Sequence, residues 1–172
     1  MVPLLRPVAS TVKTVWIIRH MLYHVCIGLV YAWVLREWWQ ELSFRLITLS
    51  VVGSVLPDVD HMVYFFGYGR NDFYAKEVKV LLKRKKIRTL FSFLTDNHKE
   101  NTSLKMHNIG VVILFFIVSL LSFIISFETG VILFGAMCLH LMFDMFDDFL
   151  ILGSLNPNWK RMGVRRLFSY LK

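Results

Sequence analysis

The hydrophobic positions of this chain gather into four apolar segments that are separated by polar stretches. A helix needs roughly 20 apolar residues, at about 1.5 Å each, to cross the hydrocarbon core of a bilayer. Most of the segments approach or exceed that length, so the pattern predicts an all-α fold, a polytopic transmembrane bundle of about four spans that forms a single membrane domain over 1–172. The predicted spans are 16–35, 42–56 continued by 62–66, 108–127 and 129–152.

The second apolar segment is short and stops at a proline. The residue before a proline is disfavoured in the α conformation, so we expect the helix to end before Pro57 and the span to be broken at the sequence PDVDH. A break at membrane depth is tolerated only where protein or a water-filled cavity covers the freed backbone groups. Such breaks often mark binding sites, which makes this segment the first candidate for function.

Lysine and arginine are distributed unevenly between the connections. They are frequent in the loop 70–105 and in the tail 156–172, whereas the turn around Glu128 has none and the first connection has only Arg36 and Arg45. By the positive-inside rule, the basic loop, the basic tail and both termini are predicted to be cytoplasmic. The run KRKK at 83–86 is expected to contact anionic lipid headgroups, at about 1 kcal/mol per basic residue.

Composition agrees with a membrane protein. The chain is 56% hydrophobic, above the roughly 45–50% of a soluble domain. Its net charge of +8 follows from the topology, and the basic loop lacks interleaved aromatic residues, so no nucleic-acid partner is expected. Cys26 and Cys138 lie apart inside apolar segments, which indicates neither a disulfide framework nor a cysteine zinc site.

Aspartate and histidine occur where a membrane span tolerates them least. An ionised carboxylate at the bilayer centre costs roughly 2.5–3.5 kcal/mol even on a lenient scale, so such residues normally face an interior site. The predicted topology places the aspartates and histidines of all four spans in the cytoplasmic half of the membrane. The residues concerned are His24, Asp58, Asp60, His61, His107, His140 and Asp144.

This set favours a metal or proton site. His140 and Asp144 are four residues apart, so they share one helix face, which Asp148 extends and Asp147 flanks. Histidine and aspartate without thiolates suit zinc, manganese or iron, and bridging carboxylates would allow one or two ions. Taken singly, His140 with Asp144 could instead be a helix-packing hydrogen bond, and PDVDH a helix-ending turn. His20 could be a further ligand or a residue at the membrane interface.

The same residues resemble the YdjM-like family of membrane-bound, metal-dependent hydrolases of bacterial and archaeal inner membranes. The family pattern is a histidine followed four residues later by a small residue, then LPDxDH, then HRGxTHS, then SHxxxD. It is matched by His24 with Gly28, by LPDVDH at 56–61, by His107, and by His140 with Asp144. In the third element Thr102 stands in place of the first histidine and Asn108 in place of the serine.

The resemblance implies a hydrolase acting at the cytoplasmic side on a phosphoester or lipid-linked substrate. The implied metal ligands are Asp58, Asp60, His61, His107, His140 and Asp144, with His24 as a further ligand or as a residue that supports one. Zinc is the leading ion, and Asp147 or Asp148 is the implied general base. Two non-enzymatic alternatives stay open. One is an ion or proton conductor with a relay of Asp and His residues, and the other is a structural adaptor that recruits a partner through its basic loop.

Overall fold

The computed structural model describes residues 6–97 and 104–160 of the chain. Within these ranges the regular structure is helical, with no strand, so the all-α prediction is confirmed for the described residues. The helices are α1 (Arg6–Trp39), α2 (Phe44–Val55), the 3-10 turn η1 (Leu56–Asp58), α3 (Val59–Phe66), α4 (Phe73–Lys83), α5 (Ile87–Asn97), α6 (Ile109–Ile124) and α7 (Glu128–Leu152).

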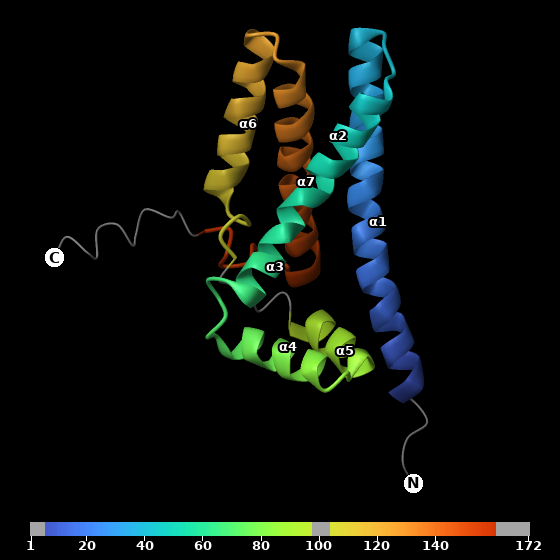
Figure 1. Cartoon of the computed structure of the whole chain (residues 1–172), viewed down its shortest axis with the longest axis vertical. Helices are drawn as coiled ribbons and strands as arrows, with labels where there is room; N and C mark the ends of the chain where they lie inside the picture. Colours follow the sequence, from blue (N-terminus) through green and yellow to red (C-terminus); the bar gives the residue numbers. More distant parts are fainter. Residues whose placement is uncertain (1–5, 98–103, 161–172) are drawn as a thin grey trace, which may run out of the picture.

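The long helices form a bundle around α2 and α7. Figure 1 shows α2 running obliquely between α1 and α7, while α6 stands against the other side of α7. At the end of the bundle where α1 begins, α4 and α5 lie across the helices, and α5 packs against α1. The first residues of α1 and the two short helices therefore share one end of the molecule.

Within the described part of the chain, two helical stretches are long and apolar enough to cross a membrane, by length and composition alone. They are Phe44–Phe66, which combines α2, η1 and α3, and Glu128–Leu150 within α7. Helix α6 is also apolar but shorter, at 16 residues, than the predicted span 108–127. The predicted span 16–35 falls within α1, which is longer at both ends.

The predicted break at PDVDH is a single tight turn. Helix α2 ends at Val55, before Pro57 as predicted, but η1 continues the helical path and α3 begins at Val59. Pro57 lies in the first turn of η1, where its missing N–H group breaks no hydrogen bond within η1 itself. Asp58 and His61 therefore project from a nearly continuous helix rather than from an open loop.

Glycines allow α2 to pass closely between its two neighbours. A Cβ atom on Gly28 of α1 would lie 2.5 Å from Ser54 Oγ and 2.7 Å from the Cα of Val51. On the other side, a Cβ atom on Gly53 would lie 2.8 Å from the carbonyl oxygen of Leu133 in α7. Small residues at such crossings are the usual means of close packing between membrane helices.

The segment 70–105, predicted as a basic loop, contains α4 and α5. Helix α4 packs on α3, and α5 packs on α4 and α1; apolar residues of α3, α4 and α5 share a buried cluster, while the lysines and arginines at 83–88 are exposed. The cluster comprises Tyr64, Phe65, Ala75, Val78, Leu81, Leu90 and Leu104. Of the predicted basic tail 156–172, only the part up to Lys160 is described, and Thr102 also lies outside the described residues.

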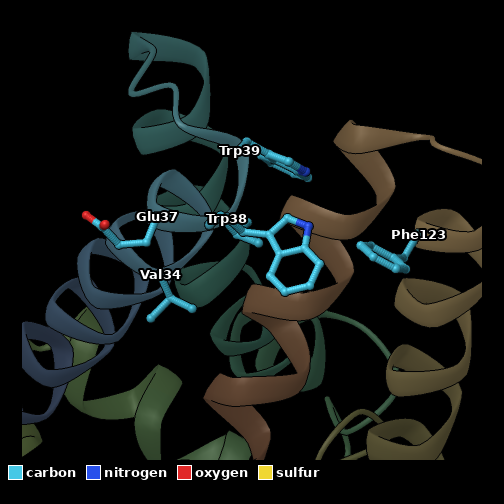
Figure 2. A pocket seen from close by; sticks show the side chains of 6 residues that line it. Val34, Glu37, Trp38, Trp39 and Phe123 are labelled. Atoms are coloured by element: carbon cyan, nitrogen blue, oxygen red, sulfur yellow. The ribbon is translucent and has the colours of Figure 1, made fainter.

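The opposite end of the bundle carries an apolar pocket of about 550 Å³ (Figure 2). Val34, Trp38 and Trp39 of α1 line it together with Phe123 of α6, and the rings of Trp38 and Phe123 lie 6.1 Å apart in a T-shaped arrangement. Aromatic side chains of α1 and α6 thus line this pocket together. The polar cluster described next lies toward the other end, near α3.

Candidate metal centre

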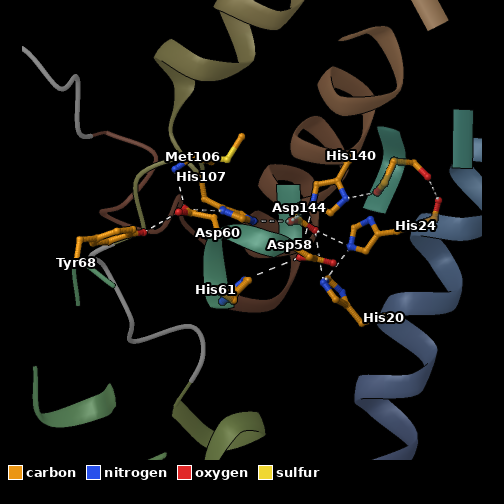
Figure 3. Close-up of polar contacts among 11 residues, drawn as sticks. His20, His24, Asp58, Asp60, His61, Tyr68, Met106, His107, His140 and Asp144 are labelled. Atoms are coloured by element: carbon orange, nitrogen blue, oxygen red, sulfur yellow. Dashed lines mark hydrogen bonds and ion pairs between the residues drawn. The ribbon is translucent and has the colours of Figure 1, made fainter. Parts of the chain in front are cut away.

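Asp144 of α7 is the centre of a cluster of histidines (Figure 3). Its Oδ1 atom lies 3.3 Å from His24 Nε2 and 3.7 Å from His20 Nε2, both on α1. Its Oδ2 atom lies 3.1 Å from His140 Nε2, one turn earlier on α7, and 3.4 Å from His107 Nε2. One carboxylate thus meets four imidazoles from three parts of the chain.

Asp58 of η1 supplies a second carboxylate to the same cluster. Its Oδ1 atom lies 3.7 Å from His140 Nε2 and 3.9 Å from His61 Nε2. Two groups of side chains could therefore hold a metal ion, since in each group one ligand atom per residue lies within 4.8 Å of all the others. The first group is His20, His24, Asp58 and Asp144, and the second is His107, His140, Asp58 and Asp144.

The two groups share both carboxylates and differ in their histidines. One pair of imidazoles comes from α1, and the other pair comes from the segment before α6 and from α7. Carboxylates bridge adjacent ions readily, and hard-to-borderline cations such as zinc and manganese accept mixed oxygen and imidazole ligands. The arrangement therefore suits either one ion or two ions separated by the carboxylates.

Buried atoms without a hydrogen-bond partner support this fit. They include Nε2 of His140, Nε2 of His107 and Oδ1 of Asp144, which all belong to the metal-binding groups. A buried polar group left unsatisfied costs about 1–3 kcal/mol. A cation bound between these atoms would remove that cost, so the residues present fit a metal ion.

A second layer of hydrogen bonds orients the histidine rings. The Nδ1 atom of His140 lies 2.5 Å from the carbonyl oxygen of Ser54, which fixes Nδ1 as the protonated nitrogen and leaves the Nε2 lone pair for the cluster. The Ser54 hydroxyl donates to the carbonyl oxygen of His24 at 2.7 Å. Ser54 of α2 therefore holds α1 and α7 at the site together.

Asp60 lies next to His107 and accepts hydrogen bonds from two other groups. It accepts the Tyr68 hydroxyl at 2.7 Å and the backbone N–H of Met106 at 2.7 Å, and its Oδ2 lies 3.6 Å from His107 Nδ1. Burial raises the pKa of Tyr68, and the hydrogen bond to Asp60 raises it further, so the phenol remains a donor. The carboxylate thereby fixes the segment that carries His107.

His107 is a histidine of the cluster whose pKa is raised by its surroundings. Burial alone lowers the pKa of His107, but the nearby carboxylates of Asp144 and Asp60 outweigh burial and raise it to about 9. In the metal-free protein the ring is therefore protonated at neutral pH and balances part of the carboxylate charge. A metal ligand must be a neutral imidazole, so an incoming ion competes with that proton.

The structure divides the candidate ligands predicted from the sequence into those that could bind a metal ion and those beside them. His24, Asp58, His107, His140 and Asp144 belong to the groups that could hold a metal ion, whereas Asp60 and His61 lie beside those groups. His20 belongs to the first group although the family pattern does not include it. The signal for it in the sequence is its position four residues before His24, which puts both rings on one face of α1, with 3.0 Å between their Nε2 atoms.

The two candidate general bases have different surroundings. Asp148 is buried, and it accepts a hydrogen bond from the indole N–H of Trp159 at 2.7 Å. The Trp159 ring in turn lies 6.0 Å from that of His107. Asp148 thus anchors the segment that follows α7 against the cluster. Asp147 is half-buried, one residue earlier on the same helix.

Comparisons with protein-family models, with curated proteins and with solved structures give no match for this chain.

Proposed function

We propose that this chain is a metal-dependent hydrolase of the cell membrane with one or two ions, zinc first, held by the groups that share Asp58 and Asp144. The observation that carries the proposal is the placement of these two carboxylates between two pairs of histidines. When bound, such ions lower the pKa of a coordinated water toward about 7 and polarise a phosphoryl oxygen. Zinc suits the mixture of imidazole and carboxylate, with manganese and iron as alternatives.

The proposed substrate is a phosphoester, free or lipid-linked. Its hydrolysis forms one bond from the water oxygen to phosphorus, breaks one bond from phosphorus to the alcohol oxygen, and transfers a water proton to that oxygen. The protein residues would hold the reacting groups together, and bulk water is kept from the central histidines His24 and His140, which are fully buried. The half-buried Asp147 is the remaining candidate for proton transfer.

Membrane placement is part of the proposal. We propose four spans, formed by α1, by α2 with α3, by α6 and by α7, with both termini, α4 and α5 on the cytoplasmic side of the inner membrane. Support comes from the two helices of sufficient length and from the exposed basic run at 83–88, which suits anionic headgroups. The motif resemblance to the YdjM-like family points to the same class of protein.

The test is hydrolysis of a chromogenic phosphodiester, bis(p-nitrophenyl) phosphate, by the detergent-purified full chain with added zinc or manganese. We expect turnover that a chelator abolishes and that His140→Ala lowers by about a hundredfold or more. Asp72→Asn, which changes a carboxylate outside the cluster that accepts the Tyr64 hydroxyl, serves as the matched control and should keep its activity. Turnover that persists in His140→Ala would overturn the proposal.

A proton or ion relay is the second candidate, because the cluster forms a continuous chain of ionisable side chains. His61, Asp58, His140, Asp144 and His20 follow one another with successive N to O separations of 3.1–3.9 Å. Such chains carry protons in membrane pumps and transporters. Proton flux into vesicles containing the purified protein, without phosphoester hydrolysis, would favour this function over the hydrolase.

A further inference from the structure

The cluster is reachable from outside the protein at one edge. The side chains of His61, Asp58 and His20 are 33%, 23% and 22% exposed, whereas those of His24 and His140 are completely buried. These three partly exposed members come from α3, η1 and α1. A substrate that reaches the cluster through the described part of the chain therefore meets the edge between α1 and α3 first.

Beside this edge lies an exposed apolar face. It belongs to the helical stretch Phe44–Phe66, one of the two long enough to cross a membrane. Met62 lies four residues after Asp58, so the two are neighbours along the helical surface, and 56% of Met62 is exposed. The further exposed apolar residues on η1 and α3 are Leu56, Val59, Val63 and Phe66.

From this juxtaposition we infer that the substrate is a phospholipid that enters sideways from the bilayer between α1 and α3. The inference rests on the proposed function and names its substrate class. The anionic phosphate would reach the edge at Asp58 and His61, where ions held by the cluster would attract it, while the acyl chains would stay against the apolar face of α3. A small hydrophilic phosphoester makes no use of that face, whereas the acyl chains of a lipid can stay in the hydrocarbon layer and pack against it while the phosphate approaches the edge.

Charge on the neighbouring helices agrees with an anionic lipid. Between Arg70 and Arg88 the chain carries eight basic and two acidic residues, and those at 83–88 are exposed. Helix α4 packs on α3 and α5 packs on α1, so this basic unit adjoins both helices that border the edge. It would concentrate anionic phospholipids beside the point of entry.

The experiment compares two substrates and two variants. The full chain in nanodiscs is given phosphatidylglycerol, and the same protein is given soluble bis(p-nitrophenyl) phosphate. Met62→Gln should lower kcat/KM for the lipid by about fivefold and leave the soluble substrate within about twofold. The matched control Leu114→Gln, at a similarly exposed position on α6, should change neither. Equal loss on both substrates, or turnover of the soluble one alone, would overturn the inference while leaving the hydrolase intact.

A second readout does not depend on catalysis. With manganese in the centre, paramagnetic relaxation of ³¹P should be enhanced for nanodisc phospholipids and reduced by Met62→Gln. If no substrate is hydrolysed although ions bind, the hydrolase proposal falls, and the ³¹P measurement still decides whether lipid phosphate reaches the centre. Relaxation enhancement of free inorganic phosphate but not of lipid phosphate would overturn lateral entry.

Discussion

The Nδ1 atom of His140 lies 2.5 Å from the carbonyl oxygen of Ser54, a residue in the last turn of α2. Carbonyls in the last turn of a helix lack the N–H donors that the next turn would supply. The helix ends there because Pro57 follows, and the freed carbonyl orients the imidazole of a helix that is distant in sequence. A local chain property thus determines which nitrogen of His140 faces Asp58 and Asp144.

Removing the proline should loosen this arrangement. In Pro57→Ala, α2 can continue through η1, and a helical N–H can replace His140 as the partner of the Ser54 carbonyl. We expect about tenfold weaker zinc binding, the size typical for loss of an outer hydrogen bond to a ligating histidine, with unchanged helix content. Competition with a fluorescent zinc chelator measures the zinc affinity, and circular dichroism measures the helix content. Undiminished zinc affinity would show that the Ser54 contact is dispensable.

The hydroxyl of Tyr68 should support metal binding through Asp60. Tyr68→Phe removes the donor at 2.7 Å from Asp60, so the carboxylate that positions Met106 and His107 loses one of its partners. We expect about tenfold weaker zinc binding, measured by the same chelator competition. Tyr64→Phe is the matched control, because it removes a hydroxyl bonded to Asp72 instead. Equal effects of the two substitutions would assign the loss to packing rather than to Asp60.

The glycines at the α2 crossings should be sensitive to a single methyl group. In Gly28→Ala and Gly53→Ala the new Cβ meets backbone atoms at 2.7 Å and 2.8 Å, which forces the helices apart at a cost of about 1–3 kcal/mol. At Gly110 the one heavy atom near a new Cβ is Asn108 Oδ1 at 3.1 Å. Gly110→Ala should therefore be neutral or stabilising by up to about 1 kcal/mol. Thermal unfolding in detergent measures all three, and a stable Gly28→Ala protein would contradict the close crossing.

Metal binding should release a proton from His107. Its pKa of about 9 in the folded, metal-free protein lies above the ordinary value of 6.5, so this group stabilises the metal-free fold below about pH 6.5, and the effect is lost as the pH rises through 9. An ion must displace the proton, so zinc affinity should increase from pH 6.5 to 9. Calorimetry in buffers of different ionisation enthalpy counts the protons, and His107→Gln should release about one fewer at pH 7.5. If zinc released the same number of protons from both proteins, the released proton would not come from His107.

Much of the cluster follows from sequence periodicity, but the direction of each side chain does not. The four-residue spacing of His140 and Asp144 predicts a shared helix face, and the structure has their side chains 3.1 Å apart. In LPDVDH, by contrast, three ionisable residues lie within four positions. Which of them faces the metal-binding groups depends on how η1 and α3 are rotated about their helix axes. Asp58 faces these groups, while Asp60 is turned toward Tyr68.

The basic segment shows another limit of sequence patterns. The apolar positions of α4 recur at helical spacing, but lysines interrupt them at Lys76, Lys79 and Lys83. Ala75 and Val78 are buried because α3 and α5 pack against α4, and these contacts form only in the folded chain. The sequence alone therefore does not identify α4 and α5 as packed helices, because their narrow apolar faces are buried only by helices from other parts of the fold.

The central claim is that two carboxylates shared by two histidine pairs bind metal. Metal content of the detergent-purified full chain, measured by plasma mass spectrometry after reconstitution with zinc, tests it most directly. We expect up to about two ions per chain, a loss of one in His20→Ala and of both in Asp144→Asn, while Asp72→Asn keeps the full content. A wild-type protein that holds no zinc, manganese or iron after reconstitution would contradict the account.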